Sequence, residues 1–257
     1  DEMRAELVGI SFCTEVGKAA YLPLGHVEGT ADLFGGGAQA AGQIPMDQAL
    51  AMLKPVLEDP AVLKILHNAK YDWKILARLG IRMAPVDDTM LMSYVLNAAL
   101  HNHGLDELAE TYVGHRCQPI KGLLGVGKNQ ITFAQVPIEA ATRYGAEDAE
   151  ITWRLWQHFR PQLSAAQVTT VYETMERPMI EVLAGMEMAG VQIDSQHLSR
   201  MSGAFAQKMA ALEEEAHGLA GGRFNLGSPK QLGEILFGQM GLTGTKAGKS
   251  GALSTSA

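Results

Sequence analysis

The sequence is poor in the features from which several kinds of protein are built. Its 257 residues include only two cysteines, Cys13 and Cys117, too few for a disulfide framework and without the paired spacing of a thiolate zinc site. No apolar run approaches the ~18 residues that a membrane-spanning helix needs, and the first four residues hold no apolar stretch of the signal-peptide kind. We therefore expect a protein of the reducing cytoplasm that has no part in a membrane.

Charge and composition are those of an ordinary globular protein. There are 28 acidic against 21 basic side chains, a net charge of −7, and 47% of the residues are apolar. At this length the chain can bury a sizeable core and is expected to form about two domains. Residues 221–257 carry four basic side chains and one acidic one, which taken alone fits a solvated loop better than a nucleic-acid site.

Periodicity divides the chain into a mixed front part and a helical rear part. Residues 7–14 and 18–24 flank a turn at Gly17 and predict an antiparallel hairpin. A short apolar run at 62–66, followed at once by a helical pattern, predicts a strand-to-helix unit. Helical patterns lie at 46–58, 69–79, 88–98, 105–113, 137–159, 164–189 and 195–220. We predict an α/β or α+β domain ending near residue 163, with a mostly helical region after it.

The first group of candidate functional residues follows the predicted strand 62–66. It runs from His67 through Asn68 and Tyr71 to Asp72, at the carboxyl end of a strand, where ligands and metals collect in open sheets. A carboxylate there suits Mg²⁺ or Mn²⁺, which prefer oxygen donors. The structural alternative, which the local pattern alone favours, is that Asp72 merely offers favourable charge to a helix N-terminus.

The second group lies in the helix predicted after Pro137. Tyr144 and Asp148 are four residues apart, so the phenol and the carboxylate share one helix face and can converge on one point. Glu147 and Glu150 are expected to turn elsewhere and to face water. Taken alone, an amphipathic helix with an interfacial tyrosine and a solvated acid is the more economical interpretation of this pattern.

Together, the two groups resemble the second and third exonuclease motifs in the proofreading domain of the bacterial DNA polymerase I family. Asn68, Tyr71 and Asp72 match the family's N-x-K-Y-D signature, and Tyr144 and Asp148 match its Y-x-x-x-D signature. Four further segments are similar to the family: 87–91, 127–133, 187–194 and 224–232. The resemblance spans nearly the whole chain, which is expected to be a fragment of a longer protein.

The resemblance implies the fold. Residues 1–163 would form an α/β, ribonuclease H-like exonuclease domain whose mixed sheet lacks its first strand. Residues 164–257 would form the start of the polymerase domain, a mostly helical segment of the thumb. The implied protein is a monomer of the bacterial cytoplasm. It would bind DNA, with a single-stranded 3′ end at the exonuclease site and duplex at the thumb.

The resemblance also implies a chemistry, the hydrolytic removal of 3′-terminal nucleotides from DNA with two divalent ions, Mg²⁺ or Mn²⁺. Asp72 and Asp148 would hold metal and, with Tyr144, would be the catalytic residues. Tyr144 would orient the attacking water or the scissile phosphate, because a phenol with an ordinary pKa of about 10 is a poor general base at neutral pH. Asn68 and Tyr71 would line the path of the terminal nucleotides.

Three lysines complete the residues that the resemblance assigns to DNA. Lys246 and Lys249 would contact phosphates at the tip of the thumb, and Lys128 is likewise assigned to DNA binding. Phosphate contacts of this kind give an affinity that falls with salt and carry no sequence information.

The match is incomplete at one place. The family's first motif, an Asp-x-Glu pair on the strand before the hairpin, is absent from the 257 residues, and Asp1, Glu2 and Glu6 lie on the wrong side of a turn to replace it. With two of four carboxylates, tight binding of two divalent ions is not expected, so the chain as given should be inactive or nearly so. The alternative is a parent protein whose domain is a catalytically dead scaffold that binds DNA and supports the polymerase.

Overall fold

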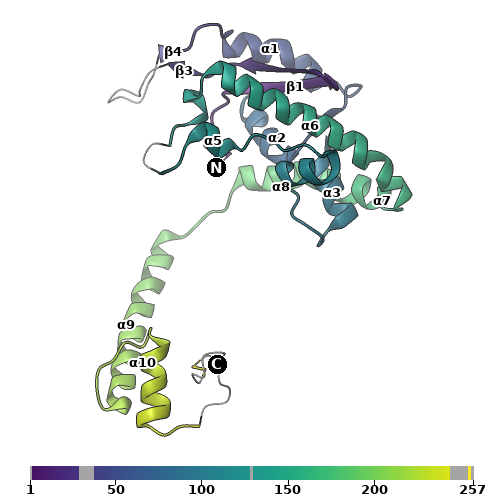
Figure 1. Ribbon diagram of the computed structural model, residues 1–257. Coiled ribbons are helices and arrows are strands. Elements are labelled where there is room, and N and C mark those ends of the chain that lie inside the picture. Colours follow the sequence, from purple (N-terminus) through teal and green to yellow (C-terminus); the bar gives the residue numbers. More distant parts are fainter. Residues whose placement is uncertain (1, 29–37, 128–129, 244–253, 256–257) are drawn as a thin grey trace. The chain divides into compact units, whose positions relative to one another are not determined.

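Figure 1 shows the computed structural model, which describes residues 2–28, 38–127, 130–243 and 254–255. The chain forms two compact units, Asp1–Gly190 and Val191–Ala257. Within the described residues, every strand belongs to the first unit and the second unit is helical. The α/β fold with a helical rear part, predicted from the sequence, is confirmed.

The first unit begins with an antiparallel hairpin. Strands β1 (Gly9–Glu15) and β2 (Lys18–Pro23) pair along most of their length. At the turn between them Gly17 has a φ of 80°, a conformation that glycine adopts without steric cost. The hairpin predicted for this part of the chain is thus confirmed.

Helix α6 (Ile138–Ala165) packs across this hairpin (Figure 1). The approach is close because of Gly145, at which a Cβ atom would lie 2.6 Å from Ser11 Oγ and 2.9 Å from a ring carbon of Tyr21. Glycine in mid-helix lowers helix stability, so its presence here is explained by the space that the hairpin requires. The hairpin therefore supports the helix that carries the predicted tyrosine–aspartate pair.

A second, parallel pair of strands consists of β5 (Lys64–Leu66) and β6 (Val86–Asp88). Helix α2 (Ala69–Arg78) begins shortly after β5, and α3 (Thr89–Asn97) follows β6 directly. The predicted strand-to-helix unit is confirmed. β6 is a strand that hydropathy does not predict, because two of its three residues are aspartates.

The first unit contains further elements, including a 3-10 turn at Phe133–Gln135. The others are β3 (Val27–Glu28) paired with β4 (Ala38–Gln39), and helices α1 (Met46–Leu57), α4 (Leu105–Leu108), α5 (Ile120–Leu124), α7 (Thr169–Val171) and α8 (Arg177–Ala189). π-Helical turns continue α4 over Ala109–Val113 and lead from α7 into α8 over Tyr172–Glu176.

Two apolar clusters hold these helices together. The first joins α3, α4, α6 and the turn before α8, and contains Met92, Leu108, Leu155, Phe159 and Tyr172. The second joins α1, α2 and α8, and contains Leu57, Trp73, Leu76, Met83 and Ala184. Because Tyr172 and Ala184 are fully buried, the compact unit continues past the predicted boundary at residue 163 and ends at Gly190. As a boundary between functional domains, residue 163 stays a prediction.

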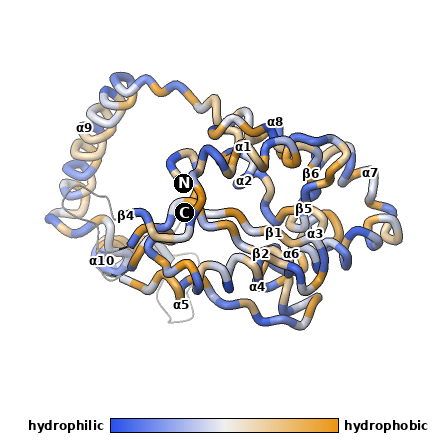
Figure 2. The backbone as a smooth tube through the Cα atoms, turned by 90° about the horizontal axis from the view of Figure 1, so that it is seen from above, coloured by the Kyte–Doolittle hydropathy of each residue, from blue (hydrophilic) through white to orange (hydrophobic). Residues whose placement is uncertain are grey.

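The second unit is built on α9 (Ser195–Ala220), α10 (Pro229–Gly233) and a π-helical stretch, Glu234–Gln239. Asp194 caps α9, since its carboxylate accepts a 2.8 Å hydrogen bond from the backbone N–H of His197. Figure 2 shows hydrophilic and hydrophobic stretches alternating along α9. In the part of the chain that the structure describes, no helix combines the length and the apolar character that crossing a bilayer requires.

Candidate active site

The first predicted group lies where β5 gives way to α2. Asn68 precedes the helix with a φ of 61°, in the left-handed region that asparagine tolerates better than most residues. Its side chain and that of Tyr71 are exposed, Tyr71 to 38%. Asp72 lies in the first turn of α2 and is partly buried. Two exposed side chains that can meet a ligand thus stand beside one shielded carboxylate.

The surroundings of Asp72 disfavour its charged form. Burial raises the pKa of its carboxyl group to about 7, and the negative charge of Asp88 adds to this shift. The lysines on either side give no compensation, because Lys70 pairs with Glu187 and Lys74 pairs with Glu2 and Glu187. A divalent cation next to this carboxylate would reverse the balance in favour of the charged form.

The structural alternative for Asp72 assigned it to the N-terminus of α2. Asp72 does lie in the first turn, so its charge stays a candidate for that effect. The hydrogen-bond cap, in contrast, comes from Asp88, whose carboxylate accepts hydrogen bonds from the backbone N–H groups of Asn68 at 3.1 Å and Ala69 at 2.8 Å. Helix α2 has no side-chain cap from its own preceding residue. Asp72 is therefore not needed to satisfy the start of the helix.

The second predicted group is on α6, as expected. Tyr144 and Asp148, one helical turn apart, are close enough for each to shift the pKa of the other. Burial raises the pKa of Asp148 to about 6, the Tyr144 hydrogen bond opposes that shift, and the charges of Asp106 and Glu147 add to it. Burial and the neighbouring Asp148 also raise the pKa of the Tyr144 phenol far above its ordinary value. The ring of Phe133 meets that of Tyr144 edge to face, with centroids 6.0 Å apart.

Glu147 does not face water as predicted. Its carboxylate is partly buried and bonds to His115 Nε2 at 2.7 Å and to the backbone N–H of Gln118 at 2.9 Å. It therefore fastens the 115–118 segment to α6. Sequence periodicity cannot reveal this contact, because the partner segment has no regular secondary structure whose orientation could be predicted.

The structure places the two predicted aspartates in different local surroundings. Asp72 has Asp88 as its acidic neighbour, whereas Asp148 has Asp106 and Glu147. No group of three or more histidine, cysteine or acidic side chains is arranged to hold a metal ion within residues 2–28, 38–127, 130–243 and 254–255. The donor chemistry of the two carboxylates fits Mg²⁺ or Mn²⁺ in kind, since both are oxygen ligands. That the two carboxylates lie close enough together to bind the same two metal ions stays a prediction.

The predicted and the observed sets of site residues differ in two ways. Lys128, Lys246 and Lys249 fall outside the described residues, and their assignment to DNA stays a prediction. Conversely, sequence analysis missed Asp106 and Asp88. Asp106 is in the first turn of α4, and Asp88 directly precedes α3, a position typical of a helix cap.

Comparison with known proteins shows which families the chain matches. Residues 2–164 match the family described as 3′-5′ exonuclease, and residues 195–257 match DNA polymerase family A. DNA polymerase I of Rhizobium leguminosarum is 52% identical over the whole chain, and that of Pseudomonas aeruginosa is 42% identical over 94% of it. The chain spans about a quarter of the length of both relatives, 26% in each case.

A solved structure shows the same fold. It is the POL domain of Pol1 from M. smegmatis, in complex with DNA primer-template and dNTP. The likeness has a TM-score of 0.70 at 25% sequence identity, and covers 93% of this chain and 37% of the other.

Proposed function

Because the chain belongs to the bacterial DNA polymerase I family, we propose that its first unit is part of a 3′-5′ proofreading exonuclease that hydrolyses the 3′-terminal nucleotides of DNA. The proposal is supported above all by the pair of shielded carboxylates, Asp72 and Asp148, whose pKa values are raised to about 7 and about 6. Groups held in an unfavourable charge state in this way are typical of functional sites. Both lie on the family's motifs.

Asp72 and Asp148 would hold divalent ions, Mg²⁺ or Mn²⁺, two in the complete domain. Bound there, such ions stabilise the attacking and leaving oxygens of an in-line displacement. Tyr144 keeps its proton at physiological pH because its pKa is raised. Its phenol is therefore a hydrogen-bond donor that orients the water or the scissile phosphate, and not a general base.

The exposed side chains at the start of α2 would meet the DNA strand. Tyr71 presents an accessible ring on which a terminal base can stack, and Asn68 presents an amide that can bond to the sugar or phosphate. Lys128 would bind DNA as well, and Lys246 and Lys249 would contact duplex phosphates as part of the thumb. The whole protein would act as a monomer in the bacterial cytoplasm.

The 257 residues by themselves would be inactive or nearly so. They carry no Asp-x-Glu pair ahead of the hairpin, and Glu2 cannot substitute because it is paired with Lys74. Lys74 is two positions from Asp72 on α2, which places the two side chains on nearly opposite faces of the helix. The missing carboxylates would have to come from the longer protein.

The decisive experiment uses the longer protein of which these 257 residues are a part. Release of nucleotide from a 3′-labelled single strand is measured with Mg²⁺ for the wild type, Asp72→Ala and Asp148→Ala. Each variant should lose at least about 100-fold in rate, since each removes a metal ligand. Glu139→Ala is the matched control, because Glu139 is an exposed acid on α6, paired only with Arg143, and it should keep the wild-type rate.

Two outcomes would contradict the proposal. If Asp148→Ala leaves the release rate unchanged, the assignment of the site is wrong. If the wild-type protein binds DNA but releases no nucleotide with Mg²⁺ or Mn²⁺, the domain is the catalytically dead scaffold.

A further inference from the structure

Strand β6 ends in two adjacent buried carboxylates that the proposed chemistry does not use. Asp87 is 0% exposed and Asp88 is 2% exposed. Aspartate is almost never buried to this degree unless its charge is satisfied by partners. What each carboxylate bonds to therefore shows what this strand end does.

Asp88 joins the starts of two helices. One oxygen, Oδ1, accepts hydrogen bonds from the backbone N–H groups of Asn68 at 3.1 Å, Met90 at 2.8 Å and Leu91 at 3.4 Å. The other, Oδ2, accepts one from Ala69 at 2.8 Å. Two of these donors begin α2 and two begin α3, so one side chain caps both helices.

The contact to α2 is the unusual one. An N-cap normally comes from the residue just before the helix, as Asp88 does for α3. At α2 that position is Asn68, which is in the left-handed conformation and makes no side-chain cap. The start of α2 therefore depends on a carboxylate 19 and 20 residues further along the chain.

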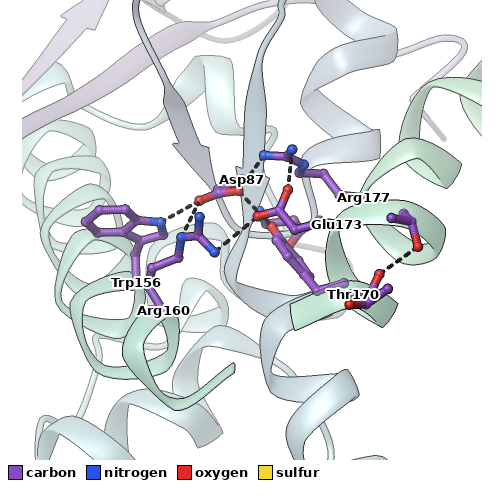
Figure 3. Close-up of polar contacts among 9 residues, drawn as sticks. Asp87, Trp156, Arg160, Thr170, Glu173 and Arg177 are labelled. Carbon is purple, nitrogen blue, oxygen red and sulfur yellow. Dashed lines mark hydrogen bonds and ion pairs between the residues drawn. The ribbon is translucent and has the colours of Figure 1, made fainter. Parts of the chain in front are cut away.

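Asp87, the preceding residue of β6, makes polar contacts with side chains of other helices, as Figure 3 shows. It accepts hydrogen bonds from Trp156 Nε1 at 2.7 Å and from the Tyr172 hydroxyl at 3.1 Å. Arg177 lies at 3.4 Å and Arg160 at 3.8 Å. Trp156 is on α6, two turns after Asp148, so neighbouring residues of β6 bond to the two helices that carry the candidate metal ligands.

We propose that Asp88 is a positioning residue, which fixes the start of α2 against β6 and thereby sets where Asn68, Tyr71 and Asp72 stand relative to α6. What Asp88 positions rests on the proposed function; that it anchors α2 does not. Asp88 itself touches neither DNA nor reacting atoms in this account.

The substitution Asp88→Asn tests this with a change of one atom. An amide has a single acceptor oxygen. With that oxygen at the Oδ1 position the cap on α3 is kept, and the NH₂ group then faces the Ala69 N–H, so that the bond from Ala69 to Oδ2 is lost. Asp88→Ser is the second variant, because a serine caps α3 but is too short to reach Ala69.

The first readout is amide hydrogen exchange of the intact, metal-free protein, followed by mass spectrometry. Peptides covering 67–72 should exchange about tenfold faster in both variants, whereas peptides covering 89–92 should keep the wild-type rate. Asp194→Asn is the matched control, since it makes the same change at the cap of α9 and should leave 67–72 unaffected.

The second readout is the Mn²⁺ concentration that gives half the maximal nucleotide release. It should rise about tenfold in Asp88→Asn, while polymerase activity is unchanged. If 67–72 exchanges at the wild-type rate, the inference is wrong, even if the Mn²⁺ requirement changes, because the effect would then come from the lost charge. If 67–72 loosens but no protein, wild type included, releases nucleotide, the proposed function fails while the anchoring of α2 stands.

Discussion

Asp72 and Asp148 share a property that links the site to stability. Burial raises both pKa values above the ordinary 3.8, to about 7 and about 6. A carboxyl group whose pKa is higher in the folded than in the unfolded state binds more protons when folded over that interval. Stability from these groups is therefore present at low pH and lost as the pH rises towards 7.

This sign gives a first prediction. Without metal, Asp72→Asn should unfold at a higher urea concentration than the wild type at about pH 8, by roughly 1–3 kcal/mol in free energy of unfolding, and the gain should vanish below about pH 4. Asp47→Asn, at an exposed acid in the first turn of α1, is the control and should show no such pH-dependent gain. A loss of stability in Asp72→Asn at pH 8 would contradict this assignment of charge.

Tyr144 gives a second prediction. Because its phenol stays protonated, Tyr144→Phe should slow nucleotide release by about 10- to 100-fold through loss of a hydrogen-bond donor. The ratio of the wild-type rate to the Tyr144→Phe rate should stay constant between about pH 8 and pH 10, above the range in which loss of the Tyr144 hydrogen bond affects the ionisation of Asp148. A ratio that grows with pH in this range would show that the phenolate acts as a base.

For single residues, the sequence was informative where a motif or helical spacing identifies them. It was uninformative about contacts between residues that are far apart in the sequence. The Tyr144–Asp148 pair follows from helical spacing, and in the structure each residue shifts the pKa of the other. Asp88 could be recognised only as the cap of α3, since its bond to Ala69 depends on the pairing of β5 with β6. Glu147 was assigned to water for the same reason, because its partners His115 and Gln118 lie 32 and 29 residues away.

At the scale of the elements, the packing of α6 on the hairpin depends on a small residue, Gly145. Gly145→Ala should lower the free energy of unfolding by about 1–3 kcal/mol, because the new methyl group would overlap Ser11 and Tyr21 of the hairpin. Gly185→Ala is the matched control in α8. Among the described residues, no atom beyond the local helix backbone lies within 4 Å of its Cβ position, so better helix propensity should stabilise the protein slightly. Urea unfolding of both variants measures the difference, and equal effects would contradict this account of the packing.

The long elements were predictable and the short ones were not. Periodicity located both ends of α9 and the start of α6, because apolar residues recur at helical spacing over many turns, whereas α6 continues to Ala165, past its predicted end at 159. β6 is three residues long and contains Asp87 and Asp88, so it carries no hydropathy signal. The π-helical turns after α4 and α7 also escape prediction, since the sequence there has an ordinary helical pattern.

For the whole molecule, the structure predicts where the chain can be divided. A fragment of residues 1–190 should fold by itself. By far-ultraviolet circular dichroism, it should melt at the same midpoint as the first unit does within the 257-residue chain. Residues 1–163 should melt at a lower temperature, because the truncation removes Tyr172 and Ala184 from the two apolar clusters and leaves Asp87 without Tyr172 and Arg177. Equal midpoints for the two truncations would show that 164–190 adds nothing to the fold.

The sequence did not reveal this division because composition and pattern change near residue 163, where the strands have ended and helices alone remain. Packing does not follow that change. Two segments of the helical stretch, the turn at Tyr172 and helix α8, bury side chains against α3, α6 and α2. Tertiary contacts of this sort decide where a compact unit ends. Periodicity indicates only that a segment is helical and not which elements it packs against.

The buried amine of Lys74 can report local opening of the structure. Lys74 is 2% exposed and is enclosed by Glu2 and Glu187, whereas Lys18 in the hairpin is 72% exposed. A reagent that methylates accessible lysines would modify Lys18 at once and Lys74 only when α8 and the N-terminal segment lift away from α2. The ratio of the two labels, measured by mass spectrometry of one digest, would give the rate at which α8 and the N-terminal segment separate transiently from α2.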